Sequence, residues 1–249
     1  MAERAEDSQI RGLLLDIEGT TTPVDFVYKT LFPYASRKLE AFLLEHFSDR
    51  ETQKMLADLA AQHQGDERQG ARPPAWHQDT DEALLHSSIT YVHWLMAKDS
   101  KCAPLKTLQG KIWQQGYASG ELRGEVYADV PQAFERWRRQ GREICMYSSG
   151  SVLAQQLLFR STSAGDLTAY ISAFYDTGIG SKTDSESYSR IAETQRRTTS
   201  EILFISDALR EIEAARRAGM RTKLCVRQPT DTTNLGDEIV RTFDQVIPD

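Results

Sequence analysis

The stretch Gly12-Leu13-Leu14-Leu15-Asp16-Ile17-Glu18-Gly19-Thr20 decides the fold, because an unbroken apolar run ends within it at a carboxylate. A short apolar run without polar alternation is typical of a strand that is buried on both faces of a parallel sheet. Open parallel sheets bind their ligands outside the carboxyl ends of the strands. We therefore expect a central strand over residues 12–15, with Asp16 at the edge of the sheet where ligands bind.

Similar apolar runs recur in the second half of the chain, and amphipathic, helix-like sequence separates them. Gly141 and Gly219 close two of the helical segments, as glycine commonly does at the end of a helix. This alternation predicts βαβ units, and hence an α/β fold with a doubly wound, mainly parallel sheet. Further strands are expected at residues 143–147, 202–205 and 222–226, with weaker candidates at 174–175 and 246–247, and helices at 130–140, 152–159 and 208–218.

The segment between the first two strong strand candidates has a different, helical character. Its pattern predicts helices over residues 26–47, 51–62, 80–97 and 105–115. Residues 64–74 are polar and contain two glycines and two prolines, so we expect a loop between helices there. The economical architecture is an α/β core of residues 1–23 and 122–249, with an all-helical domain of residues 24–121 inserted after the first strand.

The composition excludes several classes of protein. The 249 residues are 40% hydrophobic and 27% charged, which allows an ordinary core without disulfides or structural metal. A formal charge of -6 disfavours a nucleic-acid scaffold, because binding a phosphate backbone requires a basic face. A small anionic substrate remains possible, because a few local cations and a metal can reverse the field inside a cleft.

The cysteines, histidines and N-terminus bear on compartment and metal type. Three cysteines without a short pairing argue for a reducing compartment, and Cys145 and Cys225 lie in apolar runs where a buried thiol is expected. All five histidines fall in the first half of the chain, so no histidine can ligate zinc or iron in the remainder.

Residues 1–7 are too charged for a signal peptide, and no apolar stretch reaches membrane-spanning length. We expect a cytoplasmic protein without a membrane or nucleic-acid partner.

Reactive side chains follow the predicted strands. Asp16 and Glu18 come after the first strand, Ser148-Ser149-Gly150 after the second run, and Asp207 after the third, while Lys182 lies in a glycine-containing segment between them. Each has an ordinary alternative, because Asp and Ser here can cap the helix that follows and a lysine in a loop is commonly solvated. Their joint placement at successive strand ends favours chemistry.

This set of groups suits phosphoryl transfer with a metal ion. Asp16 and Asp207 can ligate a hard divalent cation through oxygen, and Mg2+ prefers one or two carboxylates together with water and substrate phosphate. A serine hydroxyl and the amides of Ser149 and Gly150 can hydrogen-bond a phosphoryl oxygen, while Lys182 adds a fixed positive charge. A carboxylate nucleophile gives an aspartyl-phosphate that water then cleaves.

Asp-x-[Asp/Glu]-Gly-Thr after an apolar strand, followed by a strand-end serine, a lysine and a strand-end aspartate, resembles the haloacid-dehalogenase (HAD) superfamily of phosphohydrolases. The resemblance implies a HAD-like Rossmannoid core, and the helical insertion lies where that superfamily places one type of cap domain. A narrower resemblance, over nearly the whole chain, is to the enolase-phosphatase family of methionine salvage. It rests on the blocks at residues 16–24 (DIEGTTTPV), 147–151 (YSSGS) and 157–159 (LLF).

The resemblance implies a role for each matching residue. Asp16 would be the nucleophile and a ligand of one Mg2+ per subunit, and Glu18 would bind Mg2+ through its backbone carbonyl and act as an acid/base candidate. Ser148 and Ser149 would hold the substrate phosphate, Lys182 would stabilise the transferred charge, and Asp207 would complete the metal site. The family substrate is 2,3-diketo-5-methylthiopentyl 1-phosphate, which is enolised and dephosphorylated to the acireductone, and family members are typically cytoplasmic monomers.

One position departs from the wider superfamily, whose phosphatases mostly carry Asp where this chain has Glu18. The extra methylene moves the carboxyl by about an ångström, and proton transfer depends first on reach. Rival interpretations are a HAD-type phosphatase for another small sugar phosphate, a metal-free dehalogenase, a phospho-receiver switch and an inactive scaffold. A metal-free dehalogenase would leave Asp207 without a role, and phospho-receiver domains are much smaller than this chain. Every motif position here has a residue capable of its role, which argues against an inactive scaffold.

Overall fold

The computed structural model describes residues 9–228 and 238–248, so the charged segment 1–7 lies outside the described residues. The chain divides into two compact units, one made of residues 1–27 and 123–249 and the other of residues 28–122. The boundaries predicted from the sequence, at residues 24 and 121, lie close to these.

The first unit is built on a six-stranded sheet in which every pair of neighbouring strands is parallel. The strand order is β3-β2-β1-β4-β5-β6, which places the first strand in the middle. This topology confirms the predicted doubly wound α/β fold. The strands are β1 (Gly12–Leu15), β2 (Glu143–Tyr147), β3 (Ile171–Tyr175), β4 (Ile202–Ser206), β5 (Arg221–Cys225) and β6 (Ile239–Val240).

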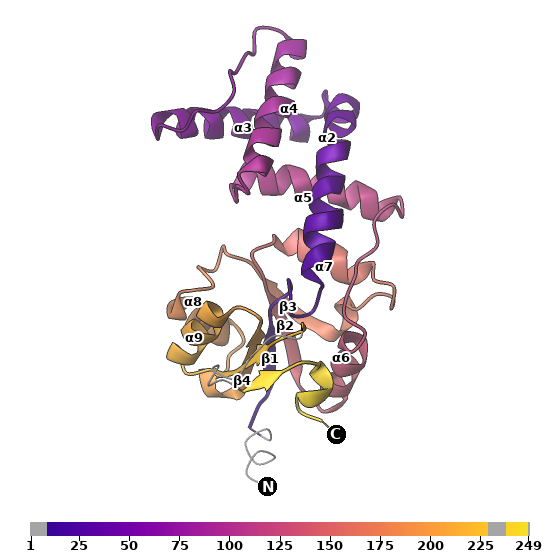
Figure 1. Ribbon diagram of the computed structural model, residues 1–249, viewed down its shortest axis with the longest axis vertical. Helices are drawn as coiled ribbons and strands as arrows, with labels where there is room; N and C mark the ends of the chain where they lie inside the picture. Colours follow the sequence, from indigo (N-terminus) through magenta and orange to yellow (C-terminus); the bar gives the residue numbers. More distant parts are fainter. Residues whose placement is uncertain (1–8, 229–237, 249) are drawn as a thin grey trace. The chain divides into compact units, whose positions relative to one another are not determined.

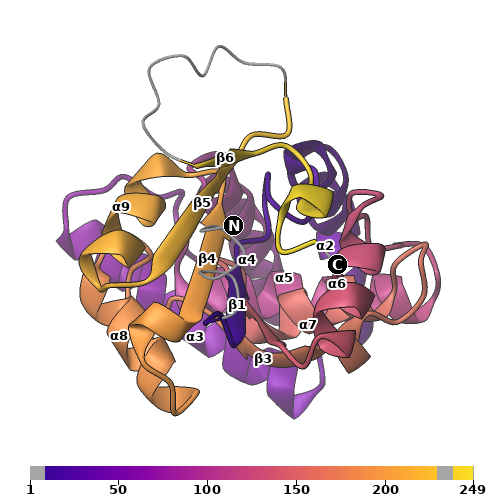
Figure 2. The same cartoon turned by 90° about the horizontal axis from the view of Figure 1, so that it is seen from below.

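Helices cover both faces of this sheet (Figure 2). On one face lie α8 (Ser185–Thr194) and α9 (Leu209–Arg217), whose Tyr188, Ile191 and Ile212 join Leu14 in one buried cluster. On the other face lie α6 (Val130–Arg139) and α7 (Val152–Arg160). Because both faces are covered, β1 has no polar side chain, which is why it was recognisable from its sequence.

The buried thiols belong to this core, as predicted. Cys145 on β2 and Cys225 on β5 are free and almost fully buried. Burial raises the pKa of Cys145 to about 12 and the pKa of Cys225 to about 11, so both stay protonated and behave as small apolar side chains.

The second unit is helical (Figure 1). A π-helix, η1 (Phe26–Leu31), leads into α2 (Phe32–His46), and α3 (Arg50–Arg68), α4 (Asp81–Ala97) and α5 (Ala103–Ala118) follow. The α2 and α5 helices pack so closely that a β-carbon at Gly116 would lie 2.6 Å from the Tyr34 hydroxyl, so a larger residue there would displace the Tyr34 ring. Trp113 of α5 donates to the Leu31 carbonyl at 2.9 Å and fixes the start of α2.

Two predictions about local structure were wrong. The expected loop at residues 64–74 begins late, because α3 continues to Arg68. Asp66 holds this last turn by accepting hydrogen bonds from Gln62 at 2.9 Å and from Tyr91 at 2.6 Å. Residues 246–247 are not a strand; they follow a 3-10 turn and are apolar because they are buried at 0% and 3% exposure.

The weak strand candidate at residues 174–175 is confirmed as part of β3. No helix among the described residues is long and apolar enough to cross a membrane. The 3-10 turns are η2 (Thr168–Tyr170), η3 (Thr199–Glu201) and η4 (Phe243–Gln245). Among these short turns, η2 and η3 lead into β3 and β4, and η4 follows β6.

Candidate active site

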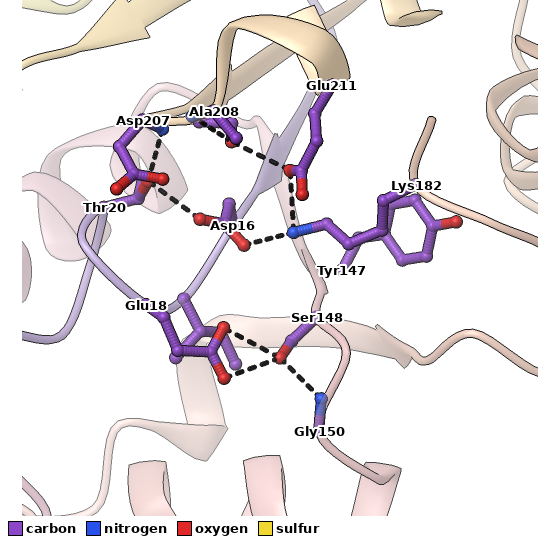
Figure 3. A network of polar contacts seen from close by, with 12 residues as sticks. Asp16, Glu18, Thr20, Tyr147, Ser148, Gly150, Lys182, Asp207, Ala208 and Glu211 are labelled. Carbon is purple, nitrogen blue, oxygen red and sulfur yellow. Dashed lines mark hydrogen bonds and ion pairs between the residues drawn. The ribbon is translucent and has the colours of Figure 1, made fainter. Parts of the chain in front are cut away.

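The strand register brings the predicted reactive residues to one edge of the sheet. Leu15, the last residue of β1, is paired with Met146 of β2 on one side and Ile205 of β4 on the other. The β2 and β4 strands continue for one more residue, to Tyr147 and Ser206. Asp16, Ser148 and Asp207 therefore follow the ends of three neighbouring strands at the same edge of the sheet. Figure 3 shows the resulting polar network, in which Asp16 lies at the centre.

Asp16 is a buried carboxylate, 3% exposed, and both of its oxygens are engaged. One oxygen accepts a hydrogen bond from the Thr20 hydroxyl at 3.0 Å, and the other is paired with the Lys182 ammonium. The loop after β1 makes this possible by folding tightly, because the amides of residues 20, 21 and 22 all donate to the Ile17 carbonyl. The carboxylate is thus fixed in orientation at the end of a rigid strand.

Lys182 lies between two carboxylates and is itself buried, 8% exposed. Its ammonium contacts Asp16 and also Glu211 of α9, at 2.8 Å. Burial lowers the pKa of Lys182, but the two carboxylates outweigh this effect and raise it, so the side chain stays charged. The hydroxyl of Tyr188 donates to the Lys182 carbonyl at 2.7 Å and holds the backbone of this loop against α8.

Glu211 is a member of the network to which sequence reasoning assigned no role. It lies in the first turn of α9, where it accepts from the Ser206 hydroxyl at 2.9 Å in addition to pairing with Lys182. Burial raises the pKa of Glu211, while Lys182 opposes the rise. The available signal was its spacing, one helical turn after Asp207, which places both carboxylates at the same end of α9.

Glu18 and Ser148 form the second half of the site (Figure 3). The Ser148 hydroxyl lies 3.1 and 3.2 Å from the two Glu18 oxygens and accepts from the Gly150 amide at 2.9 Å. Burial and the nearby Asp16 raise the pKa of Glu18, which favours a carboxyl that can hold a proton. Ser149 is exposed in the same loop, so both serines lie where the sequence predicted them, beside the end of β2.

Asp207 follows β4 and is tied to the loop after β1. Its backbone amide donates to the Thr20 hydroxyl at 3.0 Å, so Thr20 bridges the two aspartates. Burial, together with the charges of Asp16 and Glu211, raises the pKa of Asp207 to about 7. Its carboxylate lies so near the loop that a β-carbon at Gly19 would fall 2.1 Å from it, so any side chain at position 19 would displace the carboxylate.

These groups fit a magnesium ion. Among residues 9–228 and 238–248, no three His, Cys, Asp or Glu side chains are arranged to hold a metal. A site made of Asp16, Asp207 and a backbone carbonyl is the sparser arrangement that Mg2+ uses, with the other positions filled by water and substrate. The donors are all oxygen, and the raised pKa of Asp207 means that a cation beside it would remove an electrostatic cost.

Comparisons with known proteins agree with this geometry. The chain matches the family of haloacid dehalogenase-like hydrolases over residues 10–219. It is 45% identical to the enolase-phosphatase E1 of Synechococcus elongatus over 238 residues, which cover 95% of this chain and 98% of the relative. The enolase-phosphatase E1 of Drosophila melanogaster is 41% identical over 95% of this chain and 90% of its own.

Solved structures give the same result for the fold. The UTR4 protein of Saccharomyces cerevisiae superposes with a TM-score of 0.76 at 31% identity, covering 95% of this chain and all of that one (100%). The CbbY protein of Rhodobacter sphaeroides, solved with phosphate, superposes with a TM-score of 0.55 over 96% of this chain. At 14% identity, the second likeness concerns the fold alone.

Proposed function

The chain belongs to the haloacid dehalogenase-like hydrolases and, within them, to the enolase-phosphatase E1 family, and from this membership we propose how its residues act. It is a phosphoric monoester hydrolase of methionine salvage. The reaction is the enolisation and dephosphorylation of 2,3-diketo-5-methylthiopentyl 1-phosphate to the acireductone. The observation that carries the proposal is Asp16, a buried carboxylate held between Thr20 and Lys182 at the end of β1.

Asp16 attacks phosphorus and forms an aspartyl-phosphate, which water then hydrolyses. Thr20 and Lys182 fix the orientation of its carboxylate before substrate arrives, so little reorganisation is needed during attack. Lys182 keeps its charge in the buried site and can neutralise the oxygens of the phosphoryl group in transfer. Glu211 shares Lys182 with Asp16 and keeps the ammonium in place.

Glu18 serves as the acid/base group. Its raised pKa lets it hold a proton for the leaving oxygen and take one from the attacking water. Ser148 binds a phosphoryl oxygen together with Ser149, and Ser148 also orients Glu18 through the two contacts described above. The acid/base group and the phosphate-binding hydroxyl are therefore linked directly.

Asp16, the Glu18 backbone carbonyl and Asp207 would hold one Mg2+ in the proposed site. When bound, Mg2+ neutralises phosphate charge and polarises the ketone oxygens for enolisation. Asp207 is kept in position for this task by the hydrogen bond that its backbone amide donates to the Thr20 hydroxyl, and by the absence of a side chain at Gly19.

The helical unit, residues 28–122, acts as the cap that selects the substrate, while the first unit supplies phosphoryl chemistry. The free, buried thiols of Cys145 and Cys225 support the proposal of a cytoplasmic protein. We propose a monomer whose partner is its small phosphorylated substrate.

The function is tested by incubating purified protein with the diketo phosphate and Mg2+, and following inorganic phosphate and enediol absorbance together. Inorganic phosphate and enediol absorbance should both rise, and the enediol should form in the same turnover that releases phosphate. Phosphate release from other sugar phosphates, without turnover of the diketo compound, would assign the chain to the alternative, a HAD-type phosphatase of another small sugar phosphate.

A further inference from the structure

Arg227 is a buried arginine outside the network of Figure 3 that contacts the catalytic loop. It follows β5, and its side chain is only 6% exposed. Its Nε and one terminal nitrogen both donate to the Thr20 carbonyl, at 2.9 and 2.7 Å. Two charge-assisted hydrogen bonds from a planar group to one carbonyl fix the position and direction of that peptide.

The guanidinium is itself held on every side. Its other terminal nitrogen pairs with Asp129 at 2.7 Å, and Asp129 is also buried at 11% exposure. The rings of Tyr127 and Phe243 lie 4.3 and 4.6 Å from the guanidinium carbon. Asp129 also accepts from the Phe243 amide at 2.5 Å, which ties the same cluster to the C-terminal turn η4. Arg227 therefore has one defined orientation, with its donors directed at Thr20.

Thr20 is the residue through which this restraint reaches the chemistry. Its hydroxyl donates to the Asp16 carboxylate at 3.0 Å and accepts from the Asp207 amide at 3.0 Å. Its carbonyl is the group that Arg227 holds. A shift of the Thr20 backbone would thus move the supports of the nucleophile and of the second carboxylate together.

We propose that Arg227, supported by Asp129, is a positioning residue for the reaction: it holds Thr20 so that Thr20 can orient Asp16 and Asp207. Arg227 touches neither carboxylate and takes no part in bond making. A buried ion pair is weak evidence for stability, so stability alone does not account for it, whereas its two bonds to the catalytic loop are specific. The inference rests on the proposed roles of Asp16 and Asp207.

The test compares Arg227→Lys with Arg136→Met in the full chain. Lysine keeps the charge that Asp129 needs but lacks the planar fork, so it cannot give the Thr20 carbonyl two hydrogen bonds while it pairs with Asp129. Arg136 controls for loosening of the C-terminal turn: it is 12% exposed and donates at 2.6 Å to the carbonyl of Phe243, whose amide donates to Asp129. No hydrogen bond described for Arg136 reaches the loop after β1, since its partners lie in the C-terminal segment.

The readouts are turnover of p-nitrophenyl phosphate, calorimetric binding of Mg2+ to the metal-free protein, and the melting temperature. For Arg227→Lys we expect kcat to fall about 10- to 100-fold and the Mg2+ dissociation constant to rise about tenfold, as when other supports of a metal ligand are removed. For Arg136→Met both values should stay within about twofold of the wild type while the melting temperature falls.

A second variant covers the case in which Arg227→Lys fails to fold. Arg227→Met combined with Asp129→Asn removes both charges and leaves no unpaired buried carboxylate, and Asp129→Asn alone is its reference.

Where Arg227→Lys folds, a Thr20→Val background tests the route of the restraint. The further loss of kcat from Arg227→Lys should be smaller in that background, because the hydroxyl that transmits the restraint is gone.

Folded Arg227 variants with wild-type kcat and Mg2+ affinity, or an equal loss in Arg136→Met, would overturn the inference. Failure of the proposed function gives a different result. In that case the wild type would leave the diketo phosphate unconverted, or Asp16→Asn would keep its activity, whatever the Arg227 variants do.

Discussion

Gly19→Ala would displace Asp207 while altering little else. Gly19 has a φ of +79°, and a β-carbon there would lie 2.1 Å from an oxygen of Asp207. Real β-carbons are essentially never found closer than 3.0 Å, so the carboxylate must retreat by about 0.9 Å. It can do so by turning about its own short side chain, which moves it away from the place proposed for Mg2+.

We expect Gly19→Ala to lower stability only modestly but to lower kcat strongly. An alanine in left-handed conformation costs about 1–2 kcal/mol. At about 2–4 °C per kcal/mol for a domain of this size, the melting temperature should fall by roughly 2–8 °C. Moving a catalytic group by about an ångström costs on the order of a hundredfold in kcat. We therefore expect a folded protein that has lost most of its activity and binds Mg2+ weakly.

Gly141→Ala is the matched control. Gly141 has a φ of +76°, but a β-carbon there would meet nothing within 4 Å. The same backbone strain should lower the melting temperature equally while kcat stays within about twofold of the wild type. The assay is turnover of p-nitrophenyl phosphate with Mg2+ titration of both variants. Wild-type kcat and Mg2+ affinity in Gly19→Ala would refute the requirement for Asp207 at its present position.

Three further predictions concern the metal and the charges around it. EDTA should abolish turnover and added Mg2+ should restore it, because a site of two carboxylates and a carbonyl binds reversibly; full activity in EDTA would contradict the site. The pKa of Asp207 is about 7, so a proton competes with the metal below that pH. The Mg2+ affinity measured by calorimetry should therefore fall about tenfold per pH unit as the pH drops below 7. An affinity that does not change down to pH 5 would show that Asp207 titrates as an ordinary aspartate. Glu211→Gln removes one of the charges that raise this pKa, so the midpoint of that Mg2+ profile should move to lower pH, and an unmoved midpoint would remove Glu211 from the account.

The sheet and the site edge were predictable because they depend on local sequence. A strand buried on both faces has to be apolar, and β1, β2 and β4 are, so their ends could be read directly from the chain. Strand order then brings Asp16 and Asp207 together, since ligand sites of such sheets lie at carboxyl ends. Lys182 was predicted from its place among the other reactive groups and from the family pattern, because no local rule distinguishes it from a surface lysine.

The features that could not be predicted from the sequence depend mainly on contacts between residues far apart in the chain. The last turn of α3 looked like a loop because its residues are polar, yet Tyr91, 25 residues away, satisfies Asp66 and keeps the helix intact. Arg227 reaches Thr20 across 207 positions, and nothing near Arg227 in the sequence indicates that contact. Residues 246–247 matched a strand pattern because burial alone, without strand pairing, also requires apolar side chains.

The identity of the nucleophile is the central claim, and trapping the intermediate tests it most directly. An enzyme sample mixed rapidly with substrate and Mg2+ is quenched and reduced with borohydride, which converts an aspartyl-phosphate to homoserine, and its peptides are mapped by mass spectrometry. The wild type should carry homoserine at residue 16. Asp16→Asn should carry none, and its turnover should fall at least about a thousandfold. Homoserine at another residue, or near-wild-type turnover by Asp16→Asn, would contradict the mechanism.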